Sequence, residues 1–189
     1  AIGLIVCSIV GILFGTYPYA EQWRGALVIL LFVAAIGFSA IGRVGTRAKL
    51  AVWIAASVAT LVLMLGGVFG LRPIGTHLWG GLPLTIVIFV ATVAGGLPLA
   101  ILLALGRQSA LPAIRAVSVG IIEVVRGLPL IAVLFVASLI FPLFVPPELQ
   151  VDKLVRAIIG MIIFFGAYAA EIVRGGLQAI PAGQHEAAK

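Results

Sequence analysis

The stretch "EIVRGGLQAIPAGQHEAAK" (residues 171–189) brings charge, glycine and proline together directly after a long apolar run. It contrasts with the rest of the chain, which is 63% hydrophobic and 10% charged, with a mean hydropathy of +1.30. Soluble proteins carry about 25% charged residues. The chain therefore has more apolar surface than one soluble domain could bury, and we predict an integral membrane protein.

Working back from this stretch, the sequence contains six apolar candidates for membrane spans. A spanning helix needs about 20 mainly apolar residues, and the runs do not alternate apolar with polar residues as barrel strands would. Gly and Ala within the runs would let helices approach closely. We therefore predict an all-α, multi-span helical bundle. The six runs are 1–15, 25–42, 49–70, 82–105, 118–143 and 154–173.

The basic residues indicate topology. The net charge is +6, but Lys and Arg are scattered between apolar runs, which is typical of membrane-surface residues and not of a nucleic-acid-binding patch. An internal N-terminus places eight of the twelve Lys and Arg residues in the cytoplasm. The sequence thus predicts a cytoplasmic N-terminus, with residues 171–189 also in the cytoplasm and no nucleic-acid partner.

Two short motifs, "EVVRG" (residues 123–127) and "EIVRG" (residues 171–175), each place Glu and Arg three residues apart. Glu123 with Arg126, and Glu171 with Arg174, would share a helix face near the cytoplasmic surface. Two interpretations remain open. Each ion pair could only anchor its helix at the right depth, or the charges could line a gate or bind a cytoplasmic partner.

The tetrapeptide Gly-Leu-Pro-Leu occurs three times, at 81–84, 96–99 and 127–130. Proline removes an intrahelical hydrogen bond and restricts the residue before it. We expect the first copy to start a helix at Pro83 and the second to kink one at Gly95, Gly96 and Pro98. The kink would serve packing or act as a hinge.

Catalytic motifs are missing from this sequence. No Lys precedes a Ser or Thr as a phosphate-binding loop requires, and no His-Glu-x-x-His motif occurs. His77 and His185 fall on opposite sides of the membrane in the predicted topology, and Cys7 is the single cysteine. We therefore expect no enzyme activity, no cofactor and no metal, so that energy for any transport would come from another polypeptide.

Three segments carry a resemblance to a known family: "WGGLPLT" (79–85), "EVVRGLPL" (123–130) and "AYAAEIVRGGLQAIPAGQHEAAK" (167–189). Together they resemble the permease subunits of polar amino-acid ABC importers. The resemblance implies that residues 79–189 form the first part of a type I importer permease core, and that residues 1–78 are extra N-terminal spans. With this extension, and with Leu128 where many members have Thr, the chain looks most like the general L-amino-acid subgroup of that family.

The resemblance also implies a cytoplasmic coupling loop that docks into a cleft of the ATPase. In that family the "EAA" sequence opens a longer signature followed by two more spans, so the chain is expected to be a piece of a longer protein. The implied partners are ABC ATPase subunits, a second permease subunit in a homo- or heterodimer, a periplasmic amino-acid-binding protein and the lipid bilayer of the bacterial inner membrane. The loop residues are Pro181, Gly183, His185, Glu186, Ala187 and Ala188.

The implied function is ATP-driven import of polar L-amino acids. The alternative is an ion-coupled secondary transporter of small polar solutes, but such proteins usually place ionisable residues near the membrane midplane. The acidic residues of this chain lie near the predicted span ends. A membrane-embedded enzyme or assembly factor is the third possibility, and the absence of a catalytic motif disfavours it.

Overall fold

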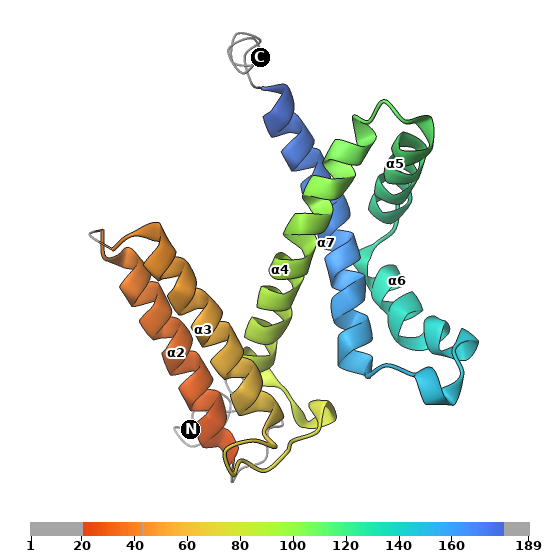
Figure 1. The fold of residues 1–189 in the computed structure, drawn as a ribbon. Coiled ribbons are helices and arrows are strands. Elements are labelled where there is room, and N and C mark those ends of the chain that lie inside the picture. The colour runs from red at the N-terminus through yellow and green to blue at the C-terminus, as the bar shows by residue number, and fades with distance from the viewer. Residues whose placement is uncertain (1–20, 43, 180–189) are drawn as a thin grey trace, which may run out of the picture. The chain divides into compact units, whose positions relative to one another are not determined.

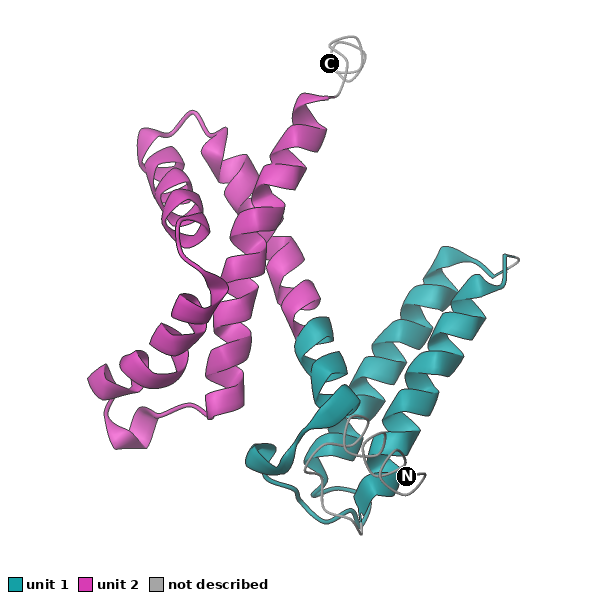
Figure 2. Cartoon of the chain, turned by 180° about the vertical axis from the view of Figure 1, so that it is seen from behind, with its two compact units in different colours: residues 1–90 teal, residues 91–189 magenta. Residues whose placement is uncertain are grey.

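The computed structural model describes residues 21–42 and 44–179, and every regular element in these ranges is a helix (Figure 1). This confirms the prediction of an all-α fold. Two compact units divide the chain within α4 (Gly81–Arg107): unit 1 covers residues 1–90 and unit 2 residues 91–189 (Figure 2).

Unit 1 contains a hairpin of α2 (Gln22–Ala40) and α3 (Thr46–Leu65), which lie side by side in both views. The rings of Phe32 and Trp53 meet edge to face at 5.7 Å between centroids. Near the turn, the Trp53 indole N–H donates to Ser39 Oγ at 2.9 Å, and Lys49 Nζ donates to the Ser39 carbonyl at 2.7 Å. Long side chains therefore join these two helices.

At the other end of the hairpin, Arg24 is buried, with 1% of its surface exposed. Its Nε lies 2.8 Å from the Glu21 carboxylate, and its Nη1 donates to the Arg72 carbonyl at 2.8 Å. Arg72 reaches this position because the chain turns after α3 at Gly66, whose φ is +68°, a region that favours glycine. A 3₁₀ turn, η2 (Thr76–Leu78), follows before α4.

Unit 2 is built where the second part of α4 crosses α7 (Lys153–Gln178). Glycines make this crossing close. A Cβ added at Gly95 would lie 2.7 Å from Ile162 Cδ1, and one at Gly166 would lie 2.9 Å from Leu99 Cδ2. Small residues allow such close approach inside a membrane, where dispersion contacts drive helix association.

The third helix of this core is α5 (Pro112–Arg126), which begins with proline at a first-turn position where its missing N–H costs nothing. Ser118 and Ile122 are its buried residues. Small and aliphatic residues of α4 and α7 surround Ile122. The buried cluster consists of Ala100, Leu103, Ala104, Ile122, Ala169 and Ala170.

After α5 the chain breaks at Gly127 and Pro129, and the next segment is bent by 104° from α5. This segment comprises α6 (Leu130–Phe135), the π-helix η3 (Val136–Ile140) and the 3₁₀ helix η4 (Phe141–Phe144). A further 3₁₀ turn, η5 (Pro147–Leu149), leads to α7.

The sequence predicted a candidate span over 118–143, and the structure divides this run between α5 and the segment from α6 to η4, with the bend between them. Pro129 lacks the N–H that would continue the helix, and its ring forces Leu128 out of the helical region. Leu128 and the glycine before it therefore become a sharp connection.

Four described helices, α2, α3, α4 and α7, are long and apolar enough to cross a membrane, and the bent pair would be a fifth if it forms one span. They correspond to the predicted runs 25–42, 49–70, 82–105 and 154–173, so the multi-span prediction is confirmed. The predicted run 1–15 lies outside the described residues.

Candidate functional site

Charged side chains from three helices gather around Glu171 in unit 2. One carboxylate oxygen of Glu171, Oε1, lies 2.7 Å from Arg107 Nη1 and 3.8 Å from Arg126 Nη1. The other, Oε2, lies 2.9 Å from Arg174 Nη2 and accepts a hydrogen bond from Arg174 Nε at 3.0 Å. Only 17% of the Glu171 side chain is exposed, so this carboxylate is the centre of the group, which we call the Glu171 cluster.

The ends of helices position the cluster. Arg107 is the last residue of α4 and Arg126 the last of α5. A cation is stabilised at a helix C-terminus, where the backbone carbonyls are unpaired. Glu171 and Arg174 lie in the final third of α7. These helix ends therefore bring the charges together, and the apolar cluster around Ile122 packs the same three helices.

Glu123 is the outer member of the cluster. Its carboxylate lies 3.5 Å from Arg107 Nη1, and 61% of its side chain is exposed. Of the two ion pairs that the sequence predicted within helices, Glu171–Arg174 is formed as expected at i, i+3. Glu123 and Arg126 instead make the ion pairs described here with residues of other helices.

Arg107 is the residue that sequence reasoning missed. In the sequence it is only one of the scattered basic residues that follow apolar runs, yet in the structure it contacts both acidic residues of the cluster. Its position at the very end of an apolar helix was the available signal, because a basic residue there faces the same membrane surface as the two predicted Glu-Arg motifs.

Tyr168 joins the cluster to the break after α5. Its hydroxyl donates to the Arg126 carbonyl at 3.3 Å, and the Arg126 guanidinium lies 5.6 Å from the Tyr168 ring centroid. The Arg126 carbonyl would otherwise lose its helical partner, because the helix stops at Gly127. Tyr168 thus satisfies the backbone at the break and places a cation over its own ring.

The cluster contains three arginines and two glutamates, an excess of one positive charge. Arg126 is 40% exposed and lies at the long limit of an ion pair with Glu171. The arrangement can lock three helix ends together, and its arginines can also attract an anionic group to the same surface.

The other predicted site residues lie elsewhere. Gly95 and Gly96 face Ile162 and Phe165 of α7, and α4 continues through Pro98 as one helix, so a kink there stays a prediction. The predicted coupling loop, residues 181–188, lies outside the described residues. Within residues 21–42 and 44–179 no three His, Cys, Asp or Glu side chains gather as a metal site would need.

Comparison with known proteins finds a matching family, described as "Binding-protein-dependent transport system inner membrane component", over residues 96–189. The chain is 45% identical over 181 residues to the inner membrane amino-acid ABC transporter permease protein YhdY of Escherichia coli, covering 94% of this chain and 49% of that protein. It is 40% identical over 199 residues to the glutamate/glutamine/aspartate/asparagine transport system permease protein BztC of Rhodobacter capsulatus, with 94% and 46% covered.

A third relative, the L-cystine transport system permease protein TcyB of Bacillus subtilis, is 34% identical over 108 residues, which cover 57% of this chain and 45% of that protein. The chain therefore spans about half the length of the curated relatives it matches. The matched family is one of transport components and not of enzymes. The comparisons confirm the resemblance seen in the sequence: through residues 96–189, the chain belongs to the inner membrane components of binding-protein-dependent transport systems, and its relatives are amino-acid ABC transporter permeases.

Proposed function

We propose that the protein containing this chain is the permease subunit of an ATP-driven importer that moves polar L-amino acids across the bacterial inner membrane. The family match over residues 96–189 carries this proposal. The names of the relatives supply the substrate class, since YhdY is an amino-acid permease and BztC serves glutamate, glutamine, aspartate and asparagine. Energy comes from a separate ATPase subunit, because the sequence contains no phosphate-binding loop.

The partners follow from this proposal. A periplasmic amino-acid-binding protein delivers the substrate, a second permease subunit completes the pathway, and ABC ATPase subunits bind on the cytoplasmic side. The distribution of Lys and Arg supports a cytoplasmic N-terminus.

Residues 1–78 would form an N-terminal extension and residues 79–189 the first part of the permease core. Three observations support this division. The family match begins at residue 96, and TcyB matches little more than half of the chain whereas YhdY matches nearly all of it. The division of the chain into compact units falls nearby, between residues 90 and 91.

The Glu171 cluster would link the coupling loop to the membrane helices. Glu171 and Arg174 lie shortly before the end of α7 at Gln178, so they precede the predicted loop by only a few turns. A movement of the loop would pull first on this end of α7. The ion pairs to Arg107 and Arg126 would then pass that movement to the ends of α4 and α5, which would make the cluster part of a cytoplasmic gate.

Uptake by the reconstituted complex tests the proposed function. The full-length protein is placed in liposomes with its ATPase and binding protein, and uptake of a panel of labelled L-amino acids is measured. We expect uptake to require both ATP and the binding protein. Uptake that follows a sodium or proton gradient without ATP would instead indicate the secondary transporter.

The coupling loop has its own test. Glu186→Lys in the full-length protein should weaken co-purification of the ATPase, with little loss of membrane insertion, because it reverses the charge of the predicted docking segment. Glu148→Lys is the matched control, since Glu148 lies in η5, outside the predicted loop, and undergoes the same charge change. Undiminished co-purification of the ATPase with Glu186→Lys would contradict the assignment.

A further inference from the structure

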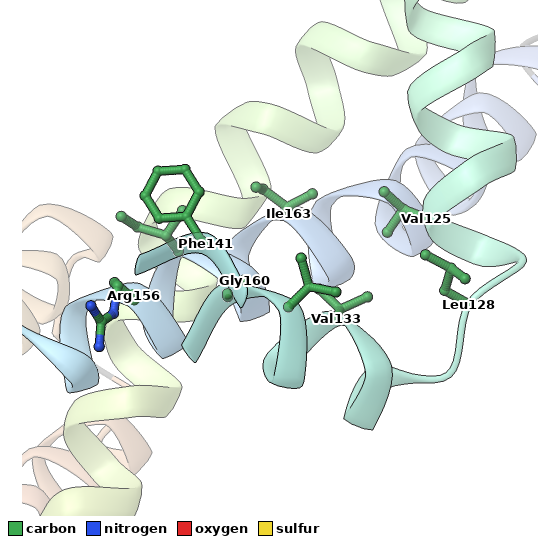
Figure 3. A pocket seen from close by; sticks show the side chains of 10 residues that line it. Val125, Leu128, Val133, Phe141, Arg156, Gly160 and Ile163 are labelled. Carbon is green, nitrogen blue, oxygen red and sulfur yellow. The ribbon is translucent and has the colours of Figure 1, made fainter. Parts of the chain in front are cut away.

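A cavity of about 340 Å³ lies in unit 2 between α7 and the segment that follows the break (Figure 3). The bend of 104° carries α6 and η3 away from the direction of α5 and leaves this space beside α7. Its volume is within the range of ligand pockets, about 300–1,000 Å³. The lining is apolar except for one arginine, and consists of Val125, Leu128, Val133, Val136, Ala137, Phe141, Arg156, Ile159, Gly160 and Ile163.

The cavity is elongated, with different chemistry at its two ends. Figure 3 shows Val125 and Leu128 at one end and Arg156 with Phe141 at the other. Gly160 forms part of the lining where α7 approaches η3: a Cβ there would lie 3.3 Å from the Ala137 Cβ. A linear apolar group can therefore lie along α7 between these ends.

Arg156 is the charged residue of the lining, and its Nε is buried without a hydrogen-bond partner. It lies one turn inside α7, after Lys153, the first residue of that helix, and after Asp152, whose carboxylate caps the Leu154 N–H at 2.8 Å. Charged residues mark this end of α7 as the end at the membrane surface. Arginine at such a depth extends its charged group toward the headgroup layer and keeps its stem in apolar surroundings.

We propose that this cavity binds an anionic phospholipid, with an acyl chain along the apolar lining and the headgroup phosphate at Arg156. The phosphate would supply the acceptor that the buried Nε lacks, and arginine binds phosphate through directed, charge-assisted hydrogen bonds. An acyl chain longer than the cavity could extend out of it, because several lining residues, among them Ile159 and Phe141, are about half exposed. The site is separate from the Glu171 cluster and does not depend on the transported substrate.

Cross-linking of lipid to the full-length protein tests the proposal. A photoreactive amino acid replaces Phe141, the protein is reconstituted in vesicles of equal parts phosphatidylglycerol and phosphatidylcholine, and the cross-linked lipid is identified by mass spectrometry. One basic residue near the membrane surface gives about a five-fold preference for an anionic lipid. We therefore expect phosphatidylglycerol to be captured about five times as often, and Arg156→Gln to reduce this ratio to about one.

Lys153→Gln is the matched control, because Lys153 is an exposed basic residue of the same helix end that does not line the cavity, so its loss should leave the ratio of lipids captured in the cavity unchanged. Ile163→Phe, which fills the cavity, should lower capture of both lipids, and this second variant tests the site if Arg156→Gln does not assemble. Four results would each overturn the proposal: equal capture of the two lipids by the wild type, capture of a protein segment in place of lipid, an equal loss in Lys153→Gln, or loss of the preference on adding glycerol phosphate.

Discussion

The two units hold their helices together by different means. In unit 1, α2 and α3 are joined by side chains that reach across the hairpin, such as the rings of Phe32 and Trp53 and the hydrogen bonds to Ser39. In unit 2, α4 and α7 meet where side chains are missing, at Gly95 and Gly166. Removing one side-chain contact between α2 and α3 should therefore destabilise unit 1 less than adding a side chain at the α4–α7 crossing destabilises unit 2.

The two units also differ in how their buried charged residues are paired. Arg24 is paired within its own helix end, with Glu21, and bonds to one backbone carbonyl. Glu171 instead contacts arginines of three helices. Loss of the Glu171 carboxylate would thus affect every helix of the unit 2 core.

The largest effect is expected from Glu171→Gln. Breaking a buried ion pair by removing one partner costs about 3–5 kcal/mol, because the other charge is left uncompensated. Since 17% of Glu171 remains exposed, we expect a loss of about 3 kcal/mol in the free energy of unfolding, measured by denaturation of the purified full-length protein. Glu123→Gln, which removes the outer carboxylate, should cost less than about 1 kcal/mol. Equal losses in the two variants would show that Glu171 is not the centre of the cluster.

A somewhat smaller effect is expected at the glycine crossing. Gly96→Leu would drive a side chain into Phe165 and the α7 backbone, and overpacking of this kind costs about 1–3 kcal/mol. Gly120→Leu is the control, since Gly120 lies in α5 with nothing within 4 Å of an added Cβ. We expect the melting temperature to fall only for Gly96→Leu. A similar fall in both would mean that the leucine disturbs the helices by itself and that close approach of α4 to α7 is not required.

In unit 1, glycines of the turn after α3 offer a sharper comparison. Gly66 and Gly67 both have positive φ, so alanine at either position costs about 1–2 kcal/mol in backbone strain. Only at Gly66 would the new Cβ collide with the Arg72 carbonyl that Arg24 binds. Gly66→Ala should therefore increase hydrogen exchange across α2 and α3 more than Gly67→Ala does, and should leave the core of unit 2 protected. Faster exchange in both units would contradict the expectation that the disturbance stays within unit 1.

The Gly-Leu-Pro-Leu repeat shows how much of this fold the sequence could predict. The first copy starts α4 as expected, the second lies within α4 without ending it, and the third breaks the chain between α5 and α6. The length of the apolar run and the position of Pro83 were enough to predict that the first copy starts a helix. The other two differ through their surroundings: Gly95 and Gly96 are held against α7, whereas Gly127 follows the charged end of α5, where Tyr168 can satisfy the freed carbonyl.

The Glu171 cluster could be predicted only in part. Glu and Arg three residues apart point to an ion pair on one helix, and Glu171 with Arg174 forms one. The pairs of Arg107 with Glu171 and Glu123 join residues of different helices, and one sequence contains no signal for which helix ends will meet. The cavity beside Arg156 could likewise not be predicted from the sequence, because it results from the bend after α5.

The smallest effect is expected from Trp53→Phe. This substitution retains an aromatic ring against Phe32 but removes the N–H that donates to Ser39 Oγ, and a net hydrogen bond is worth about 1 kcal/mol. Ser39→Ala removes the same bond from the acceptor side. Each single variant already removes the whole hydrogen bond between Trp53 and Ser39. The double variant Trp53→Phe/Ser39→Ala should therefore lower the free energy of unfolding by no more than either single variant, apart from packing losses. Fully additive costs would mean that α2 and α3 are held by the rings and not by the hydrogen bond, which would make this hairpin resemble the apolar crossing of α4 and α7 in unit 2.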